Sequence, residues 1–334
     1  MAKIEGFTIL VTGGAGFIGS HLCDTLLAQG HQVIALDNLR NGSLDNLKEA
    51  STNPRFRFIK GDILSKDTCQ EALKNVDYVY HLACLGVRHS LHSPFENHQV
   101  NAEGTLRLLE AALEANIKHF YYISTSEVYG KTTDFPIVET SPTKPTTVYG
   151  ASKLAGEHYT QAFNECFGMN TTVLRIFNNY GPRAHYEGDA GEVIPRTIVK
   201  VLYGEQPVIF GNGSITRDFF FVKDTAKALS SLMTIDGLNG LTLNIGTGVE
   251  ITIKMLIEKL LELLDKTDLG IKYLPDRPAD VPRLWVKANH FKATTNFEAG
   301  YSFEQGLQET IPYYKQKVSE KNLLDEIKDQ NWEK

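Results

Sequence analysis

The sequence contains little cysteine and no long apolar run. Its four cysteines, Cys23, Cys69, Cys84 and Cys166, are scattered along the chain and form no CxxC pair, which favours free thiols in a reducing cytoplasm over a disulfide framework. We find no apolar run of about 18 residues, the length that a membrane-spanning helix requires. Residues 1–5 also lack the pattern of a signal peptide. The sequence therefore predicts a cytoplasmic protein with no membrane partner.

Basic residues are not in excess either. The 34 lysines and arginines are outnumbered by 40 aspartates and glutamates, the net charge is -6, and no basic block occurs. Such a chain offers no dedicated surface for nucleic acid or for an anionic membrane. His89, His92 and His98 lie close together in sequence, but the segment 90–94 is typical of a loop and no helical HxxxH pair accompanies it. We therefore predict no metal site.

Short apolar segments alternate with helical patterns along the first half of the chain. The segments are rich in β-branched and aromatic residues, and between the first two of them Ile18, Leu22 and Leu26 recur at a spacing of four. Strands that alternate with helices imply right-handed crossovers and a parallel sheet with helices on both faces. The sequence therefore predicts a doubly wound α/β fold, with strands at 7–12, 31–37, 56–60, 77–83, 120–124 and 171–177.

The pattern changes after about residue 177. Residues 178–191 are rich in glycine, proline, asparagine and charge, as is typical of a loop at a domain edge. The later pieces are too few and too irregular for another doubly wound domain, so we expect a smaller α+β lobe interleaved with the sheet. In it we expect helices at 193–203 and 251–264 and a short strand at 207–211. The predicted domains are 1–177 joined by part of 219–250, then mainly 178–316, then a peripheral tail at 317–334.

A glycine-rich loop, Gly13-Gly14-Ala15-Gly16-Phe17-Ile18-Gly19, stands between the first strand and the first helix. Glycines let the backbone approach a pyrophosphate, and the helix N-terminus offers unpaired N–H groups and a positive dipole end. Asp37 lies 21 residues beyond Gly16, at the end of the second strand. There its carboxylate can accept both ribose hydroxyls of an adenosine and would repel a 2'-phosphate. NAD is therefore preferred over NADP, although Arg40 nearby leaves NADP open.

Acid/base groups gather between Ser124 and Lys153. Ser124-Thr125-Ser126-Glu127 follows the fifth strand, and Tyr149 and Lys153 come after a polar, proline-broken loop. Residues four apart share a helix face, and a neighbouring ammonium or a cationic nicotinamide would favour the phenolate of a tyrosine. A phenol with a pKa near 10 is otherwise a poor base at neutral pH. Tyr149 and Lys153 together therefore indicate a site for proton transfer.

With these motifs in order, residues 9–300 resemble the extended short-chain dehydrogenase/reductase family, specifically its nucleotide-sugar epimerases, dehydratases and decarboxylases. The resemblance implies a Rossmann sheet, NAD as cofactor and a nucleotide-sugar substrate. It implies that Tyr149 is the catalytic acid/base, that Lys153 binds the nicotinamide ribose, and that Thr125 bonds the sugar hydroxyl with help from Ser126. The expected cofactor contacts are Gly13, Gly16, Phe17, Ile18, Gly19, Asp37, Asn38, Asp62, Ile63, Leu82, Ala83, Tyr149 and Lys153.

Glu127 bears on the reaction that follows oxidation of the sugar at C4. The stretch 124–130 is similar to GDP-mannose-type 4,6-dehydratases, in which this Glu is the base at C5, and to UDP-glucuronate decarboxylases. The segment 86–90 resembles instead the loop of 4-epimerases, and Ser126 stands where dTDP-glucose-type dehydratases carry Asp. A 4,6-dehydratase is the leading hypothesis, with a 4-epimerase, a UDP-glucuronate decarboxylase and a non-catalytic NAD-binding sensor as alternatives. The alternative to a catalytic role for Glu127 is a structural one, in which a salt bridge holds its side chain away from the site.

Binding of a nucleoside diphosphate requires fixed cations, and guanidinium groups suit phosphate geometry. By resemblance, Arg217 and Arg277 hold the diphosphate, Asn179 bonds the diphosphate or the sugar, and Val193 lines the base pocket. Arg88 and Arg283 are weaker candidates, since lone arginines are mostly solvated. Helices expected at 101–115 and 151–167 resemble those that pair in the dimer interface of this family, so we expect a homodimer.

Overall fold

A central parallel sheet dominates the computed structural model, which describes residues 6–277, 280–328 and 332. Its seven strands follow the order β10-β6-β5-β4-β1-β2-β3. The six predicted strands are confirmed with small shifts at their ends, and β10 is an addition from the region 219–250. The strands are β1 (Thr8–Thr12), β2 (Gln32–Asp37), β3 (Phe56–Lys60), β4 (Tyr78–His81), β5 (His119–Thr125), β6 (Thr171–Ile176) and β10 (Thr242–Ile245).

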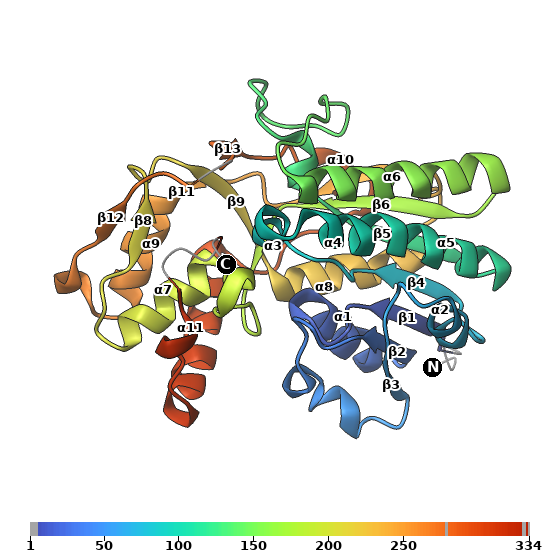
Figure 1. Ribbon diagram of the computed structural model, residues 1–334, viewed down its shortest axis with the longest axis horizontal. Coiled ribbons are helices and arrows are strands. Elements are labelled where there is room, and N and C mark those ends of the chain that lie inside the picture. Colours follow the sequence, from blue (N-terminus) through green and yellow to red (C-terminus); the bar gives the residue numbers. More distant parts are fainter. Residues whose placement is uncertain (1–5, 278–279, 329–331, 333–334) are drawn as a thin grey trace.

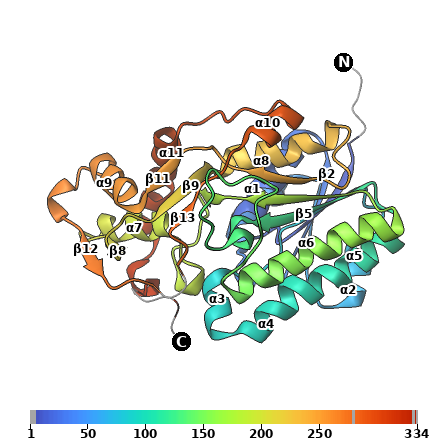
Figure 2. The same cartoon turned by 90° about the horizontal axis from the view of Figure 1, so that it is seen from above.

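Helices cover both faces of this sheet (Figure 2). One face carries α1 (Phe17–Ala28) and α8 (Val222–Ser231), and the other carries α2 (Lys66–Ala72), α4 (Pro94–His98), α5 (Gly104–Glu114) and α6 (Val148–Phe167). Side chains alternate along each strand, so Ile9 and Val11 pack with Leu22 of α1 while Leu10 packs with Leu108 of α5. These two apolar layers confirm the doubly wound Rossmann fold.

A smaller lobe lies beside the sheet (Figure 1) and has its own apolar core. It contains a four-stranded sheet and a two-stranded sheet. The strands are β7 (Asn178–Tyr180), β9 (Thr216–Phe221), β11 (Glu250–Thr252) and β13 (Arg283–Leu284), then β8 (Val208–Phe210) and β12 (Lys272–Leu274). The helices after residue 178, apart from α8, are α7 (Val193–Leu202), α9 (Ile253–Leu263), α10 (Asn289–Thr295) and α11 (Phe303–Glu320). Because α8 and β10 return to the large sheet between lobe segments, the lobe is interleaved as predicted.

The structure corrects several local expectations. The segment around His92 was predicted to be a loop, but residues Val87–His92 form the helix α3, which ends at Ser93 before Pro94. The helix predicted at 101–115 begins with a π-helical turn at Gln99–Glu103. The helix predicted at 251–264 starts at Ile253, because the residues before it pair with β9 as strand β11.

The expected peripheral tail is also corrected. Its boundary at residue 317 falls inside α11, and Leu323 beyond the helix is only 1% exposed. Tyr203 accepts a hydrogen bond from the backbone N–H of Leu323 at 3.1 Å, so this part of the chain packs against the lobe. The remainder of the tail expectation at 329–331 and 333–334, the signal-peptide reading of 1–5, and residues 278–279 of the Arg277 segment lie outside the described residues.

Candidate active site

The carboxyl ends of the central strands open into a cavity of about 600 Å³ that also reaches the lobe. Strands β2 and β4 flank β1 on opposite sides, so successive connections run to opposite sides of β1. This is the switch point at which doubly wound sheets bind ligands. Gly13 follows β1 and Leu82 follows β4, and both line the cavity. The topology therefore places the predicted motifs around one space.

The glycine loop allows close approach of the backbone. Gly13 has a φ of +69°, and a Cβ on Gly19 would lie 2.2 Å from the carbonyl oxygen of Gly13. Larger residues do not fit at these two positions, which explains the motif in physical terms. Because α1 begins at Phe17, its first N–H groups and positive dipole end lie at the cavity wall. The loop therefore provides a cradle of the kind that a pyrophosphate requires.

Asp37 closes β2 and is 8% exposed. Its carboxylate accepts hydrogen bonds from the backbone N–H of Ala15 at 3.0 Å and of Leu39 at 2.8 Å. Burial raises the pKa of Asp37, and these two N–H groups oppose that rise. Each carboxylate oxygen has a second acceptor site, so the side chain can still receive ribose hydroxyls.

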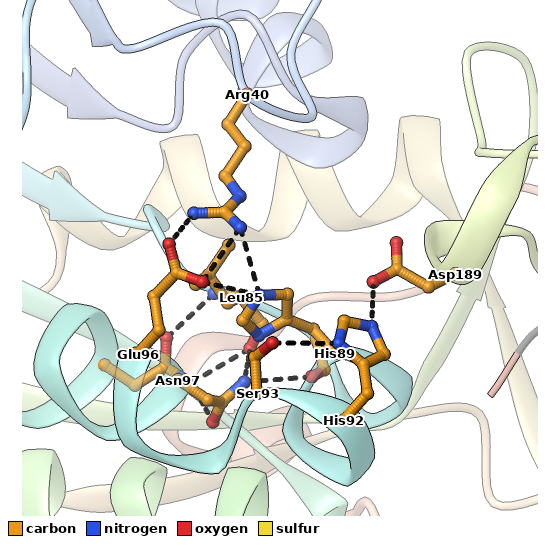
Figure 3. Close-up of polar contacts among 10 residues, drawn as sticks. Arg40, Leu85, His89, His92, Ser93, Glu96, Asn97 and Asp189 are labelled. Carbon is orange, nitrogen blue, oxygen red and sulfur yellow. Dashed lines mark hydrogen bonds and ion pairs between the residues drawn. The ribbon is translucent and has the colours of Figure 1, made fainter. Parts of the chain in front are cut away.

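Arg40 is the residue that kept NADP as an alternative cofactor in the sequence analysis. Its guanidinium is engaged by a neighbouring carboxylate. Its guanidinium pairs with Glu96 of α4, with 3.0 Å between Nη2 and Oε2, and lies 3.2 Å from Nε2 of His89. Beyond it, His92 Nε2 lies 2.9 Å from a carboxylate oxygen of Asp189 in the lobe (Figure 3). These residues form a charged rim that joins the loop after β2, the helices α3 and α4, and the lobe.

The other cofactor positions expected from the sequence line the same cavity. Asn38 donates to Asp62 at 3.0 Å, and Asp62 also accepts from the backbone N–H of Leu64 at 2.9 Å. The apolar contacts come from Ile63, which follows β3, and from Leu82 and Ala83. All of the cavity residues predicted for the cofactor are thus brought together: Gly13, Gly16, Phe17, Ile18, Gly19, Asp37, Asn38, Asp62, Ile63, Leu82, Ala83, Tyr149 and Lys153.

Tyr149 and Lys153 lie one turn apart near the start of α6, where Thr147 caps the helix by accepting from the backbone N–H of Gly150 at 3.1 Å. Burial raises the pKa of Tyr149 well above its usual value, and a side-chain hydrogen bond with Thr125 opposes that rise. Burial lowers the pKa of Lys153, whose ammonium lies 4.3 Å from the centre of the Tyr122 ring. Titratable groups with perturbed pKa values in one cavity are typical of a catalytic site.

A buried ion pair fastens α6 to the sheet behind these groups. Glu157 lies one turn beyond Lys153, and its carboxylate meets the guanidinium of Arg175 on β6, with 2.6 Å between Oε2 and Nη2. Ser124, the residue before Thr125, donates a hydrogen bond to the same carboxylate. Since removing one partner of a buried pair is strongly destabilising, this contact holds Thr125 and Tyr149 in a fixed relation.

Glu127 is the second residue of the short helical turn Ser126–Tyr129 after β5, and its backbone N–H donates to the hydroxyl of Thr125 at 3.2 Å. Its side chain lines the cavity and makes no hydrogen bond or ion pair with any residue that the structure describes. The structure therefore does not show the alternative in which a salt bridge holds Glu127 away from the site. Burial raises the pKa of Glu127, and the charge of Arg217 opposes that rise.

Arginines gather at the far end of the cavity. Arg217 of β9 donates to the carbonyl oxygen of Val281 and to Asp280, both at 2.8 Å. Arg277 pairs with the other oxygen of Asp280 at 3.1 Å, and Arg88 and Val193 line the same wall. Arg283 instead pairs with Glu250 at 2.7 Å and does not line the cavity. The site therefore presents Arg88, Arg217 and Arg277 to an anion.

No metal cluster and no membrane helix occur in the described part of the chain. No group of three or more His, Cys, Asp or Glu side chains there could hold a metal ion. None of the helices found in residues 6–277 and 280–328 is long and apolar enough to cross a membrane.

Comparison with known proteins identifies the family of this chain. The family model described as GDP-mannose 4,6 dehydratase matches residues 10–310. The chain belongs to this family. It is accordingly a nucleotide-sugar enzyme of the extended short-chain dehydrogenase/reductase group.

Relatives of this enzyme carry different activities in their names. A putative UDP-glucose 4-epimerase of Methanocaldococcus jannaschii is 37% identical over 285 residues, 83% of this chain and 89% of its own length. The UDP-N-acetylglucosamine 4-epimerase of Methanobrevibacter ruminantium has a TM-score of 0.89 at 34% identity, over 94% of this chain and all of that chain. The dTDP-glucose 4,6-dehydratase of Streptomyces venezuelae, crystallised with NAD bound, has a TM-score of 0.89 at 30% identity, over 95% and 99%.

Two cavity residues of this nucleotide-sugar enzyme were not singled out from the sequence. The side-chain amide of Asn179, the predicted substrate contact, already makes two hydrogen bonds within the protein. Its oxygen accepts from the hydroxyl of Thr225 at 2.5 Å, and its nitrogen donates to the carbonyl oxygen of Phe177 at 3.1 Å. Asn178 lines the cavity and its buried Oδ1 has no partner in the described chain. Asn179 lines the cavity as well, so the predicted contact and its neighbour Asn178 both border the space for a substrate. The second residue is Glu192, which no motif marked.

Proposed function

We propose that this enzyme oxidises C4 of a nucleoside-diphosphate hexose with NAD and then eliminates water between C5 and C6, as a 4,6-dehydratase. The observation that carries the proposal is the carboxyl of Glu127, which lies beside Thr125 in the cavity without a hydrogen-bonding partner in the described chain. Loss of water from a 4-keto sugar requires a base at C5. A partly buried carboxyl with a raised pKa is suited to that role.

NAD as the cofactor is supported by the fit of the cradle. The close approach at Gly13 and Gly19 admits a pyrophosphate, Asp37 has acceptor capacity for ribose hydroxyls, and Glu96 holds the guanidinium of Arg40. When bound, NAD would take a hydride from the sugar and later return it. The NAD seen in the Streptomyces venezuelae dehydratase supports the same assignment.

Oxidation at C4 would depend on Thr125, Tyr149 and Lys153. Thr125 and Tyr149 line the same cavity, and Thr125 opposes the rise in the pKa of the phenol, so a sugar hydroxyl placed between them could pass its proton to the phenolate. Burial alone disfavours that phenolate, and the opposing influences would be Thr125, the ammonium of Lys153 and the positive charge of the nicotinamide. We propose that Ser126, which is buried beside Thr125, orients the sugar.

The diphosphate would lie against the arginines. Arg217 and Arg277 are positioned by Asp280, and Arg88 lines the wall between them and the catalytic residues. Asn179, as predicted, and its neighbour Asn178 both line the cavity, and their amides would bond the sugar or the diphosphate. Val193 would contact the base.

A second candidate is a 4-epimerase. It is supported by the 4-epimerases among the relatives and by the segment 86–90. A UDP-glucuronate decarboxylase is a further alternative, since proteins of that name are among the relatives and the stretch 124–130 resembles that branch.

Mass spectrometry separates these reactions. Purified enzyme is incubated with UDP, dTDP, GDP and CDP hexoses and with UDP-glucuronate. Loss of water supports the proposal, loss of carbon dioxide indicates decarboxylation, and unchanged mass with a new sugar configuration indicates epimerisation. Reaction of any substrate would exclude a non-catalytic sensor. In a 4,6-dehydratase, Glu127→Gln should stop water loss yet permit hydride transfer from C4, whereas Glu103→Gln, an exposed change outside the cavity, should change neither.

We further propose a homodimer that works in the cytoplasm. The outer face of α4, α5 and α6 exposes Phe95 (71%), Leu106 (36%) and Phe167 (58%), as in a surface that a second copy covers. The four cysteines are free, which suits a reducing compartment. Light scattering of the enzyme and of Phe95→Glu tests the dimer, since a monomer in both cases contradicts it.

A further inference from the structure

The carboxyls of the cavity fall into two groups. Seven carboxylic side chains line it. Five have partners: Asp37 and Asp62 accept from backbone N–H groups, Glu96 pairs with Arg40, Asp189 with His92, and Asp280 with Arg217 and Arg277. The other two, Glu127 and Glu192, make no hydrogen bond or ion pair through their carboxyls with any described residue. Unpaired carboxyls inside a cavity are costly, so these two are candidates for chemistry.

Glu192 stands directly before α7, at the N-cap position of the helix. Its side chain makes no cap hydrogen bond, so the helix does not engage the carboxyl. Its backbone N–H is bonded to the carbonyl oxygen of His185 at 2.7 Å, which fixes the main chain, and its side chain lines the cavity. Burial raises the pKa of Glu192, and the charges of Arg88 and His185 oppose that rise. The carboxyl is thus presented to the substrate rather than to the helix.

Glu127 and Glu192 share their electrostatic surroundings. Both act on the phenol of Tyr149, raising its pKa, and both are influenced by Arg88 and Arg277. The two carboxyls therefore lie within electrostatic reach of the same catalytic centre. A pair of carboxyls in different environments is the usual basis for separate acid and base roles.

Elimination of water requires an acid and a base. The predicted site residues supply a carboxyl base, Glu127, but no carboxyl acid. The leaving hydroxyl at C6 needs a proton, but Ser126 stands where a carboxyl could have supplied it, and a serine hydroxyl is a poor acid. Glu192 is the other cavity carboxyl that the described chain leaves without a partner.

We propose that Glu192 is the general acid for the leaving hydroxyl at C6, with Glu127 as the base at C5. In the 4-keto sugar, the carboxylate of Glu127 takes the proton from C5, and the electrons of that C–H bond form the C5–C6 double bond. The C6–O bond breaks, and its oxygen receives the proton of Glu192 and leaves as water. The hydride taken from C4 then adds to C6, and C5 regains a proton from Glu127. The product is a 4-keto-6-deoxy sugar, with no net oxidation.

This inference rests on the proposed 4,6-dehydratase function, and deuterium labelling tests it directly. In heavy water, the enzyme should give a product that has lost water and carries solvent deuterium at C5. Glu192→Gln should still form the 4-keto sugar and exchange the C5 hydrogen, but should lose water about 10²–10⁴-fold more slowly. Glu127→Gln should neither exchange C5 nor lose water. Glu103→Gln is the matched control.

A substrate with fluorine in place of the C6 hydroxyl separates acid catalysis from a structural role. Fluoride leaves without a proton, so Glu192→Gln should release fluoride from this analogue at nearly the rate of the unmodified enzyme. Slow release of fluoride would contradict the proposal, as would loss of water at the normal rate from the ordinary sugar. If the unmodified enzyme dehydrates no hexose, the proposed function fails together with this inference. If it dehydrates one and Glu192→Gln does so equally well, only the inference fails.

Discussion

The two ends of the cavity hold their charged groups in different ways. At the cofactor end, Asp37 and Asp62 are satisfied by backbone N–H groups, and glycines shape the wall. At the substrate end, the charges belong to side chains: Arg88, Arg217 and Arg277 face two unpaired carboxyls, Glu127 and Glu192. The first arrangement depends largely on backbone groups, which most side-chain substitutions would leave in place. The second can be changed by single substitutions, which explains how relatives of one fold have different activities.

The largest expected effect is a loss of turnover at the substrate end of the cavity without a change of NAD binding at the cofactor end. Tyr149→Phe removes the phenol that takes the proton at C4 and should slow turnover by at least about 10²–10⁴-fold. Binding of NAD should be unaffected, because Asp37 and the glycine loop are unchanged. Tyr159→Phe on the same helix is the control. Calorimetry of NAD binding and a turnover assay measure both quantities, and surviving activity in Tyr149→Phe would assign the proton to another group.

A smaller effect is expected from Arg217→Lys. The lysine keeps the charge but cannot form the paired contacts of a guanidinium with a diphosphate. We expect KM for the nucleotide sugar to rise by roughly 10–100-fold, as for loss of a charged hydrogen bond, with NAD affinity unchanged. Arg283→Lys, which alters an arginine of the same lobe outside the cavity, should leave KM as it is. An equal rise in both variants would point to a general disturbance of the lobe.

The ends should also respond to pH with opposite signs. The pKa of Glu192 is raised in the folded chain, so its ionisation removes stability as pH rises above the unfolded value of about 4.5. Glu192→Gln should therefore melt about 2 °C higher at neutral pH and no higher in acid. The pKa of Glu96 is lowered by its hydrogen bond with Arg40, so its contribution is present above the unfolded value and is lost as pH falls. Thermal melts from pH 4 to pH 8 compare the two slopes.

The smallest expected effect concerns the charged rim. Glu96→Gln breaks a half-exposed pair, and such pairs contribute up to about 1 kcal/mol, so NAD should dissociate about two- to fivefold faster. Glu71→Gln is a matched control, since Glu71 pairs with Arg57 at 2.8 Å with similar exposure but away from the cavity. Stopped-flow dissociation at low and high salt tests this, because salt should reduce the difference. A difference that persists in high salt would mean that Glu96 acts in another way than through charge.

Local spacing carried most of the successful predictions. The strands, the glycine loop, Asp37 and the pair Tyr149 and Lys153 depend on contacts within one βα unit or one helical turn, so their order in sequence fixes their geometry. The helix α3 was missed because the serines, histidines and proline around it are common in loops, and packing overrode that propensity. Strand β10 was not predicted as a strand, and only its region, 219–250, was expected to join the sheet.

The sequence by itself determined that the chain is a doubly wound nucleotide-sugar enzyme, and it marked most of the charged and catalytic residues that line the cavity. Tertiary structure decided which of them are free. Pairing of β7 with β9 brings Asn179 into hydrogen-bonding contact with Thr225, and the rim holds Arg40 on Glu96. Neither partner is near in sequence. Glu192 lines the cavity because the start of α7 lies against it. Whether a carboxyl has a hydrogen-bonding partner depends on which residues the fold brings next to it.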